Sequence, residues 1–245
     1  MRSFSLNSMA ASLFSQTRRG FLLSALKKPL SIGGIRFDVE KNGSSKRRYL
    51  HIHGNESTAR DVLREHAKSQ KGIYYFVVSD KRNVLVGDCL IDPNRMFTDA
   101  GARKSLERWN KGKSAAQIDA SLALLAKDRD AFVKAVTPPK GGLLIAMHNN
   151  SEGYSIKDEV AISDRVHMPE EASPRDFMLV TSEKDFEIIA KGPYNACLQK
   201  TVRTDDGSFS VLANSRAIRY VNIEAALKNH DKQKAMIGYL EQVLR

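Results

Sequence analysis

Short apolar runs separated by more polar segments recur along most of the chain. The clearest run, residues 73–78 (IYYFVV), is rich in β-branched and aromatic residues and is typical of a buried strand. Similar runs predict strands at residues 35–39, 49–53, 83–90, 141–148, 177–180, 196–199 and 218–223. Helices are predicted at residues 57–69, 102–109, 115–136, 183–191 and 232–244.

Strands that alternate with helices favour an α/β fold, here a single domain with a mixed, largely parallel central β-sheet and helices on both faces. We expect residues 34–245 to form this domain, and residues 1–33 to be a basic segment outside it. Ligands of such sheets bind beyond the C-terminal ends of the strands. Polar residues at those ends are therefore the first candidates for a functional site.

The composition allows a sizeable core, since 42% of residues are hydrophobic and 27% are charged. The longest uncharged apolar stretches, residues 20–26 and 141–147, fall far short of the roughly 18 residues that span a bilayer. We therefore expect no integral membrane segment.

The net charge of +11 comes mostly from the start of the chain. Residues 1–48 contain ten Lys and Arg and two acidic residues, which gives a net charge of +8. The other 197 residues contain 29 Lys and Arg and 26 acidic residues, which gives a net charge of only +3. Nucleic-acid binding through released counterions needs clustered cations. We therefore expect no nucleic-acid partner for the folded part.

The N-terminal segment has the composition of a targeting signal, with no acidic residue before Asp38. Residues 17–23 (TRRGFLL) resemble the twin-arginine export motif, in which paired arginines precede an apolar run. That run is short, and no small-residue cleavage site follows it. Export is the favoured interpretation, and an organellar transit peptide or a plain tail on a cytoplasmic protein are the alternatives.

The first cluster of chemical interest is HIHGNE, residues 51–56, where a predicted strand gives way to a helix. His53 and Glu56 stand three residues apart across a Gly-Asn turn, so both side chains could reach one metal ion. Imidazole and carboxylate are good zinc ligands, and a catalytic zinc commonly keeps three protein ligands and an open position. If this cluster is considered alone, the simpler interpretation is a histidine at a strand end followed by a glutamate at a helix start.

Three more clusters lie at or near predicted strand ends. His148 ends an apolar strand, where its imidazole could be a third metal ligand or make an ordinary hydrogen bond. Asn94 and Arg95 offer an amide and a planar guanidinium that suit capture of a carboxylate, unless the arginine only pairs with a nearby aspartate in a turn. Glu224 follows an apolar run and is a candidate general base, unless it begins the next helix.

The order of these clusters resembles the zinc carboxypeptidase superfamily, which includes the carboxypeptidase A-like enzymes and the succinylglutamate desuccinylase–aspartoacylase branch. The shared pattern is H-x-x-E, Asn-Arg within D-x-N-R-x-F, a strand-end histidine and a late glutamate, with gaps of 38, 53 and 76 residues. The run HGNESTA is similar to the deacylase branch, and residues 92–97 resemble the carboxypeptidases at least as well. The resemblance covers the chain from about Tyr49 onward.

The resemblance implies a role for each matched residue. His53, Glu56 and His148 would bind one Zn²⁺ per chain, and the Asn-Arg pair would hold a substrate carboxylate. Glu224 would take a proton from the zinc-activated water and pass it to the leaving nitrogen. The activity implied is hydrolysis of an amide bond next to a carboxylate, as in a metallocarboxypeptidase, with a peptide or an N-acyl amino acid as substrate.

Two residues are weaker candidates because they depart from the family pattern. Family members often have an arginine shortly before Asn-Arg that assists the oxyanion, and the nearest here is Arg82, twelve residues before Asn94. The carboxypeptidases also have a mobile tyrosine before the late glutamate, for which Tyr194 is the nearest candidate unless it only packs. His51 is expected to support the site or the core and not to be a fourth ligand.

Two alternatives to the carboxypeptidase-like activity remain open at this point. One is an N-acyl amino acid deacylase of the desuccinylase or aspartoacylase kind. The other is a catalytically idle module that binds zinc and captures carboxylates, in which Glu224 would be missing from the site.

Overall fold

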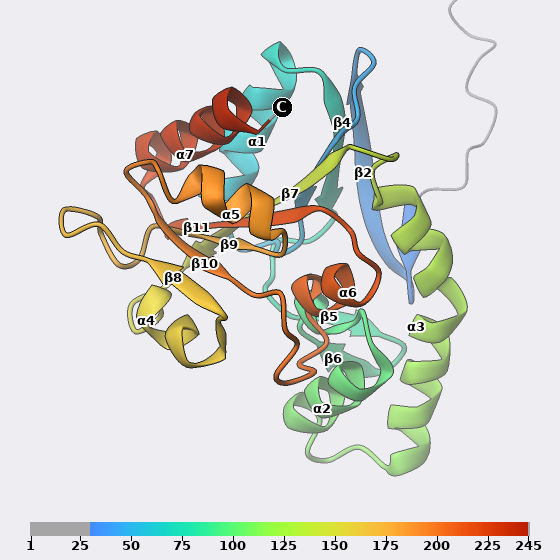
Figure 1. Ribbon diagram of the computed structural model, residues 1–245. Helices are drawn as coiled ribbons and strands as arrows, with labels where there is room; N and C mark the ends of the chain where they lie inside the picture. The colour runs from blue at the N-terminus through green and yellow to red at the C-terminus, as the bar shows by residue number, and fades with distance from the viewer. Residues whose placement is uncertain (1–29, 245) are drawn as a thin grey trace, which may run out of the picture.

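A nine-stranded sheet forms the centre of the structure, a computed structural model that describes residues 30–244 (Figure 1). Its strands are β1 (Leu30–Ile32), β2 (Ile35–Asn42), β3 (Arg47–His51), β4 (Gly72–Val77), β7 (Leu143–Asn150), β8 (Arg165–His167), β9 (Phe177–Val180), β10 (Asn195–Leu198) and β11 (Tyr220–Ala226). They lie in the order β1-β2-β4-β3-β7-β11-β9-β10-β8. The central strands β4, β3, β7 and β11 run parallel, and antiparallel pairs occur on both sides of them. The predicted mixed α/β sheet is confirmed.

Helices cover both faces of the sheet, also as predicted. One face carries α1 (Ser57–Ser69), α5 (Glu183–Ile189) and α7 (His230–Val243), and the other carries α2 (Asp99–Trp109), α3 (Ala115–Val136) and α6 (Phe209–Ser215). The described part also contains the short helix α4 (Ile156–Glu159) and two 3₁₀ turns, Pro93–Arg95 and Val160–Ile162.

Strand β7 shows why its sequence is a nearly continuous apolar run. Leu144 and Ala146 pack into the core on the α3 face, whereas Leu143, Ile145 and Met147 pack into the core on the α1 and α7 face. A parallel strand covered on both faces needs apolar residues at successive positions, because neither face meets water. The run ends where the polar residues at 148–150 begin, at the edge of the sheet that carries the site.

Several sequence-based predictions need correction. Residues 83–90 do not form one strand, because Gly87 adopts a φ of +57° and turns the chain into a separate hairpin of β5 (Val84–Val86) and β6 (Cys89–Ile91). Residues 30–33, expected outside the domain, belong to it, since Ile32 is fully buried and β1 pairs with β2. Strand β8 and helix α6 had no predicted counterpart.

The proposed export motif at residues 17–23 lies outside the described residues. Among residues 30–244, no helix is both long and apolar enough to cross a membrane.

Candidate metal centre

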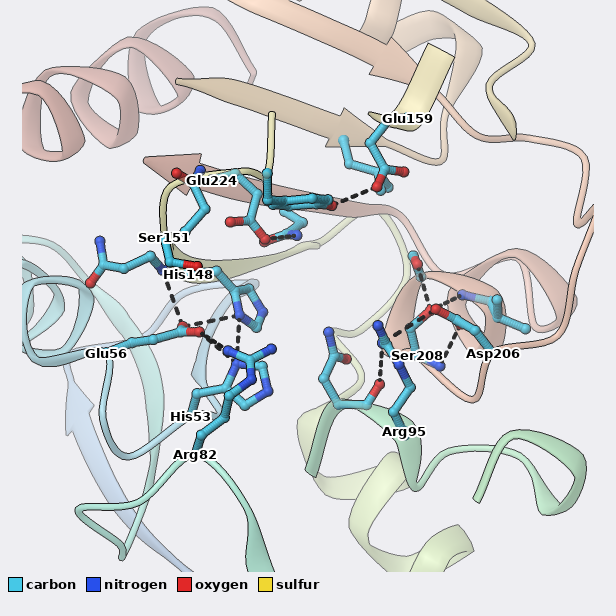
Figure 2. A pocket seen from close by; sticks show the side chains of 18 of the residues that line it. His53, Glu56, Arg82, Arg95, His148, Ser151, Glu159, Asp206, Ser208 and Glu224 are labelled. Atoms are coloured by element: carbon cyan, nitrogen blue, oxygen red, sulfur yellow. Dashed lines mark hydrogen bonds and ion pairs between the residues drawn. The ribbon is translucent and has the colours of Figure 1, made fainter. Parts of the chain in front are cut away.

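Three predicted ligands meet at one edge of the sheet. His53 follows β3, Glu56 directly precedes α1, and His148 lies near the end of β7. His53 Nδ1 lies 2.8 Å from Glu56 Oε1, His148 Nδ1 lies 3.1 Å from Glu56 Oε2, and the two Nδ1 atoms are 3.1 Å apart (Figure 2). All three side chains are almost fully buried. One ligand atom from each residue lies within 4.8 Å of the others, so the group could hold a metal ion.

The turn between the first two ligands depends on its glycine. The amide of Glu56 donates to the carbonyl of His53 at 3.1 Å, which closes the turn. A Cβ atom at Gly54 would lie 2.3 Å from the carbonyl oxygen of Ser79, so a side chain there would force the neighbouring backbone away. This close approach lets the chain carry a histidine and a glutamate toward the same point.

Asp92 fixes the tautomer of His53. His53 Nε2 lies 2.7 Å from Asp92 Oδ1, and because a carboxylate only accepts, Nε2 carries the hydrogen. In the neutral ring the Nδ1 lone pair therefore faces Glu56 and His148. Histidine ligands of metal ions are commonly oriented by a carboxylate in this way. The residues present therefore fit a bound divalent cation.

The electrostatics of the cluster also favour a positive charge at its centre. Burial acts to lower the pKa of His53, but Glu56 and the hydrogen bond to Asp92 outweigh it and raise this pKa to about 9. The two histidines hold the pKa of Glu56 well below its ordinary value in spite of its burial. Converging lone pairs and a carboxylate repel one another unless a cation lies among them, and either a proton or a metal ion can be that cation.

Arg82, a weaker candidate from the sequence, lies at this cluster. Its guanidinium pairs with Glu56 Oε1 at 2.9 Å and with Asp92 Oδ2 at 3.2 Å. It therefore bridges one candidate ligand and the carboxylate that orients another. Its side chain is 47% exposed, so it forms the outer rim of the cluster.

Glu224 lies on the strand next to the third ligand. It is on β11, which runs parallel to β7 and places Glu224 opposite His148, and the strand continues to Ala226. The alternative that Glu224 begins the following helix is therefore wrong, since α7 begins only at His230. Asn222 donates to Glu224 Oε1 at 3.2 Å, and burial raises the pKa of the Glu224 carboxyl. A raised pKa suits a group that must accept and return a proton near neutral pH.

Asn94 and Arg95 lie on the 3₁₀ turn Pro93–Arg95, and Figure 2 shows Arg95 across the cavity from His53. Asn94 Oδ1 accepts a hydrogen bond from the amide of Phe209 at 3.1 Å, which ties the turn to α6. Arg95 Nη1 donates to the carbonyl of Asn94 at 2.8 Å and lies 3.3 Å from Asp206 Oδ2. The guanidinium thus already holds one carboxylate, that of Asp206.

A cavity of about 520 Å³ joins these groups. Its lining includes His53, Glu56, Arg82, Asn94, Arg95, His148 and Glu224. Tyr194 does not line it, because its ring packs 5.3 Å from that of Tyr239. Tyr154 lines the cavity in its place, six residues after His148.

His51 lies behind the candidate ligands, as expected. It is fully buried, and its Nε2 lies 3.1 Å from the backbone carbonyl of Glu56. Burial lowers its pKa to about 4, so the ring is neutral at pH 7 and supports the turn without adding charge.

Sequence reasoning missed two sets of residues. It weighed Asp92 only as a partner for Arg95, although the D-x-N-R context placed an acid beside the site. It gave no role to Tyr154, Glu159 and Gln199, which line the cavity from α4, β10 and the segments beside them.

Comparison with known proteins gives a similarity to a solved structure and none to a protein family. No protein-family model matches the chain, and no curated protein matches it. Among solved structures, it is similar to the crystal structure of gene product Atu2144 from Agrobacterium tumefaciens, at 14% sequence identity and a TM-score of 0.45. That similarity covers 86% of this chain and 93% of the other.

Proposed function

We propose that the protein is a zinc-dependent hydrolase that cleaves an amide bond next to a carboxylate, in the manner of a metallocarboxypeptidase. The observation that carries the proposal is a buried His53–Glu56–His148 cluster on strand ends with Glu224 on the adjacent strand, all facing one cavity. Two nitrogen ligands and one carboxylate suit zinc and leave a position open for water or substrate.

His53, Glu56 and His148 would hold the ion. A zinc ion bound there supplies a Lewis acid that polarises the scissile carbonyl and makes water acidic enough to be deprotonated near neutral pH. Asp92 keeps the His53 ring in the tautomer that leaves Nδ1 free to bind.

Glu224 acts as the general base and then as the general acid. Its carboxylate takes a proton from the attacking water, and the protonated group returns that proton to the leaving nitrogen. The raised pKa that burial gives this carboxyl makes it a stronger base for the first of these two proton transfers. Asn222, which donates to one carboxylate oxygen, fixes the direction in which the group points.

Arg95 and Asn94 bind the free carboxylate of the substrate. Arg95 is about one-third exposed, and its ion pair with the partly exposed Asp206 leaves other donors of the guanidinium free to form a bidentate pair. The positive charge of Arg82 lies beside Glu56, where it can also stabilise negative charge that develops on the scissile carbonyl oxygen.

An N-acyl amino acid deacylase is the second candidate, because the cavity of about 520 Å³ is of a size that suits a small ligand. Both candidates cut an amide next to a carboxylate and differ in the acyl group. An idle carboxylate-binding module is less well supported, since Glu224 lines the cavity.

The test is a hydrolysis panel with the zinc-loaded full chain. It contains Nα-acetyl dipeptides Ac-Ala-X beside N-acetyl, N-formyl and N-succinyl amino acids, with release of the free amino acid as the readout. We expect cleavage of at least one class, and loss of cleavage in Glu224→Gln. Absence of cleavage across the panel by a chain that carries zinc would contradict the proposal.

A further inference from the structure

A further carboxylate lines the cavity away from the candidate metal ligands. Glu159, at the end of α4, is 8% exposed and lines the cavity. Its Oε1 accepts a hydrogen bond from the hydroxyl of Tyr154 at 2.5 Å, and its Oε2 accepts one from the amide of Gln199 at 2.5 Å. Figure 2 shows Glu159 apart from His53 and Glu56, across the cavity. The two donors fix the carboxylate and leave its remaining lone pairs free.

Across the described residues, Glu159, like Glu224, has no basic partner, in contrast to the cavity carboxylates of Glu56 and Asp206. Glu56 has Arg82 and two histidines beside it, and Asp206 has Arg95. Among residues 30–244, no Lys, Arg or His nitrogen lies within 4 Å of the Glu159 carboxylate. A buried carboxylate with only neutral donors has incomplete compensation for its lost hydration.

The same cavity holds another acceptor without a partner. Asn222 Oδ1 is buried and has no hydrogen-bond partner within the described part of the chain, although the residue lines the cavity. Ile162 and Leu179 add apolar surface to the wall. The cavity therefore offers hydrogen-bond acceptors, a negative charge and an apolar strip, which match an aliphatic stem that ends in a cationic nitrogen.

We propose that Glu159 is a specificity-determining residue that binds an ammonium or guanidinium group of the substrate. The inference rests on the hydrolase function proposed above, and it names the substrate class as amides that carry a basic side chain. Tyr154 and Gln199 are positioning residues, since they hold the Glu159 carboxylate and leave it facing the cavity.

The test compares substrates that differ only in the terminal cation. Lysine and norleucine have the same four-carbon stem, so Ac-Ala-Lys against Ac-Ala-Nle places the difference on the leaving residue. Ac-Lys-Ala against Ac-Nle-Ala places it on the acyl side, and arginine analogues replace ammonium with guanidinium. In one of the two positions we expect the basic substrate to have a kcat/KM about 10- to 100-fold higher than the norleucine substrate.

Glu159→Gln should bring the ratio of the two kcat/KM values close to one, through a fall in kcat/KM for the basic substrate. The matched control is Glu170→Gln, which removes a carboxylate from an exposed loop position and should keep the preference. Equal kcat/KM for lysine and norleucine at both positions in the wild type would overturn the inference and leave the hydrolase function standing.

A binding measurement separates the two proposals. Calorimetry compares Nα-acetyl-lysine with Nα-acetyl-norleucine on the full chain with zinc present. If no substrate is cleaved and acetyl-lysine still binds more tightly in a way that needs Glu159, the cation site is supported and the hydrolase function fails. If neither cleavage nor a binding preference is seen, both proposals fail.

Discussion

Replacement of Asp92 by asparagine tests whether the His53 cluster is built for a metal ion. The change keeps the size of the side chain and an oxygen that can accept from His53 Nε2, and it removes one negative charge 2.7 Å from the imidazole. His53 is 2% exposed and Asp92 is 8% exposed, so this hydrogen bond lies where solvent weakens it little. The Asp92–Arg82 pair at 3.2 Å has an arginine that is half exposed, and it contributes less.

Loss of such an outer carboxylate typically weakens metal binding about 10- to 100-fold, which corresponds to about 1.4 to 2.7 kcal/mol. We expect a decrease of this size in the zinc affinity of Asp92→Asn, measured by competition with a chromophoric chelator at fixed pH. The free energy of unfolding in the presence of chelator should change less, because no metal then contributes to it.

Asp99→Asn is the control, since Asp99 pairs with Arg129 at 2.6 Å and its side chain is 76% exposed. It should leave the zinc affinity unchanged. If Asp92→Asn binds zinc as tightly as the wild type, the negative charge of Asp92 does not strengthen metal binding through His53 and this reasoning is refuted.

Three further changes test the account at separate points. Glu224→Gln should keep the zinc and lower kcat about 10²- to 10⁴-fold, and unchanged turnover would remove Glu224 from the chemistry. Gly54→Ala should lower zinc affinity and thermal stability together, because its Cβ would lie 2.3 Å from the Ser79 carbonyl oxygen. Zinc affinity equal to that of the wild type would show that the backbone can shift to accommodate the Cβ. Burial, with a smaller effect of Arg47, lowers the pKa of His66 to about 4, so the folded state binds fewer protons than the unfolded state below pH 6.5. The free energy of unfolding should therefore fall as the pH drops from about 6.5 to 4. His66→Gln should remove up to about 2.5 kcal/mol of the fall between pH 7 and about pH 4.5, as measured by urea unfolding. An equal dependence of the free energy of unfolding on pH in both proteins would contradict this.

The central strands of the sheet and most of the candidate metal site could be predicted from the sequence, because both depend on local patterns. The run at β7 is apolar because that strand is covered on two faces, and the polar residues that follow it mark the site edge. His53 and Glu56 are joined by a turn whose glycine is visible in the sequence. Strand β1 could not be predicted, because its three residues form a strand only through pairing with β2 and burial of Ile32. A three-residue sequence indicates neither contact.

The cavity wall opposite the candidate metal ligands could not be predicted in the same way. Glu159, Tyr154 and Gln199 meet through contacts between α4, the segment before it and the end of β10, up to 40 positions apart in the chain. A glutamate that ends a short helix has no local signal of burial. Tyr194 was chosen for its place before Glu224, yet its contact with Tyr239 keeps it out of the cavity.

The most direct test of the central claim is the metal content of the purified full chain, compared with a His53→Ala/His148→Ala variant. The control is His167→Ala/His230→Ala, which removes two histidines that do not line the cavity. We predict about one zinc per chain in the wild type and in the control, and loss of zinc from the His53/His148 variant while its circular dichroism keeps the α/β signature. A wild-type chain that binds no metal even after zinc is added, or a His53/His148 variant that keeps it, would contradict the assignment of this cluster as a metal centre.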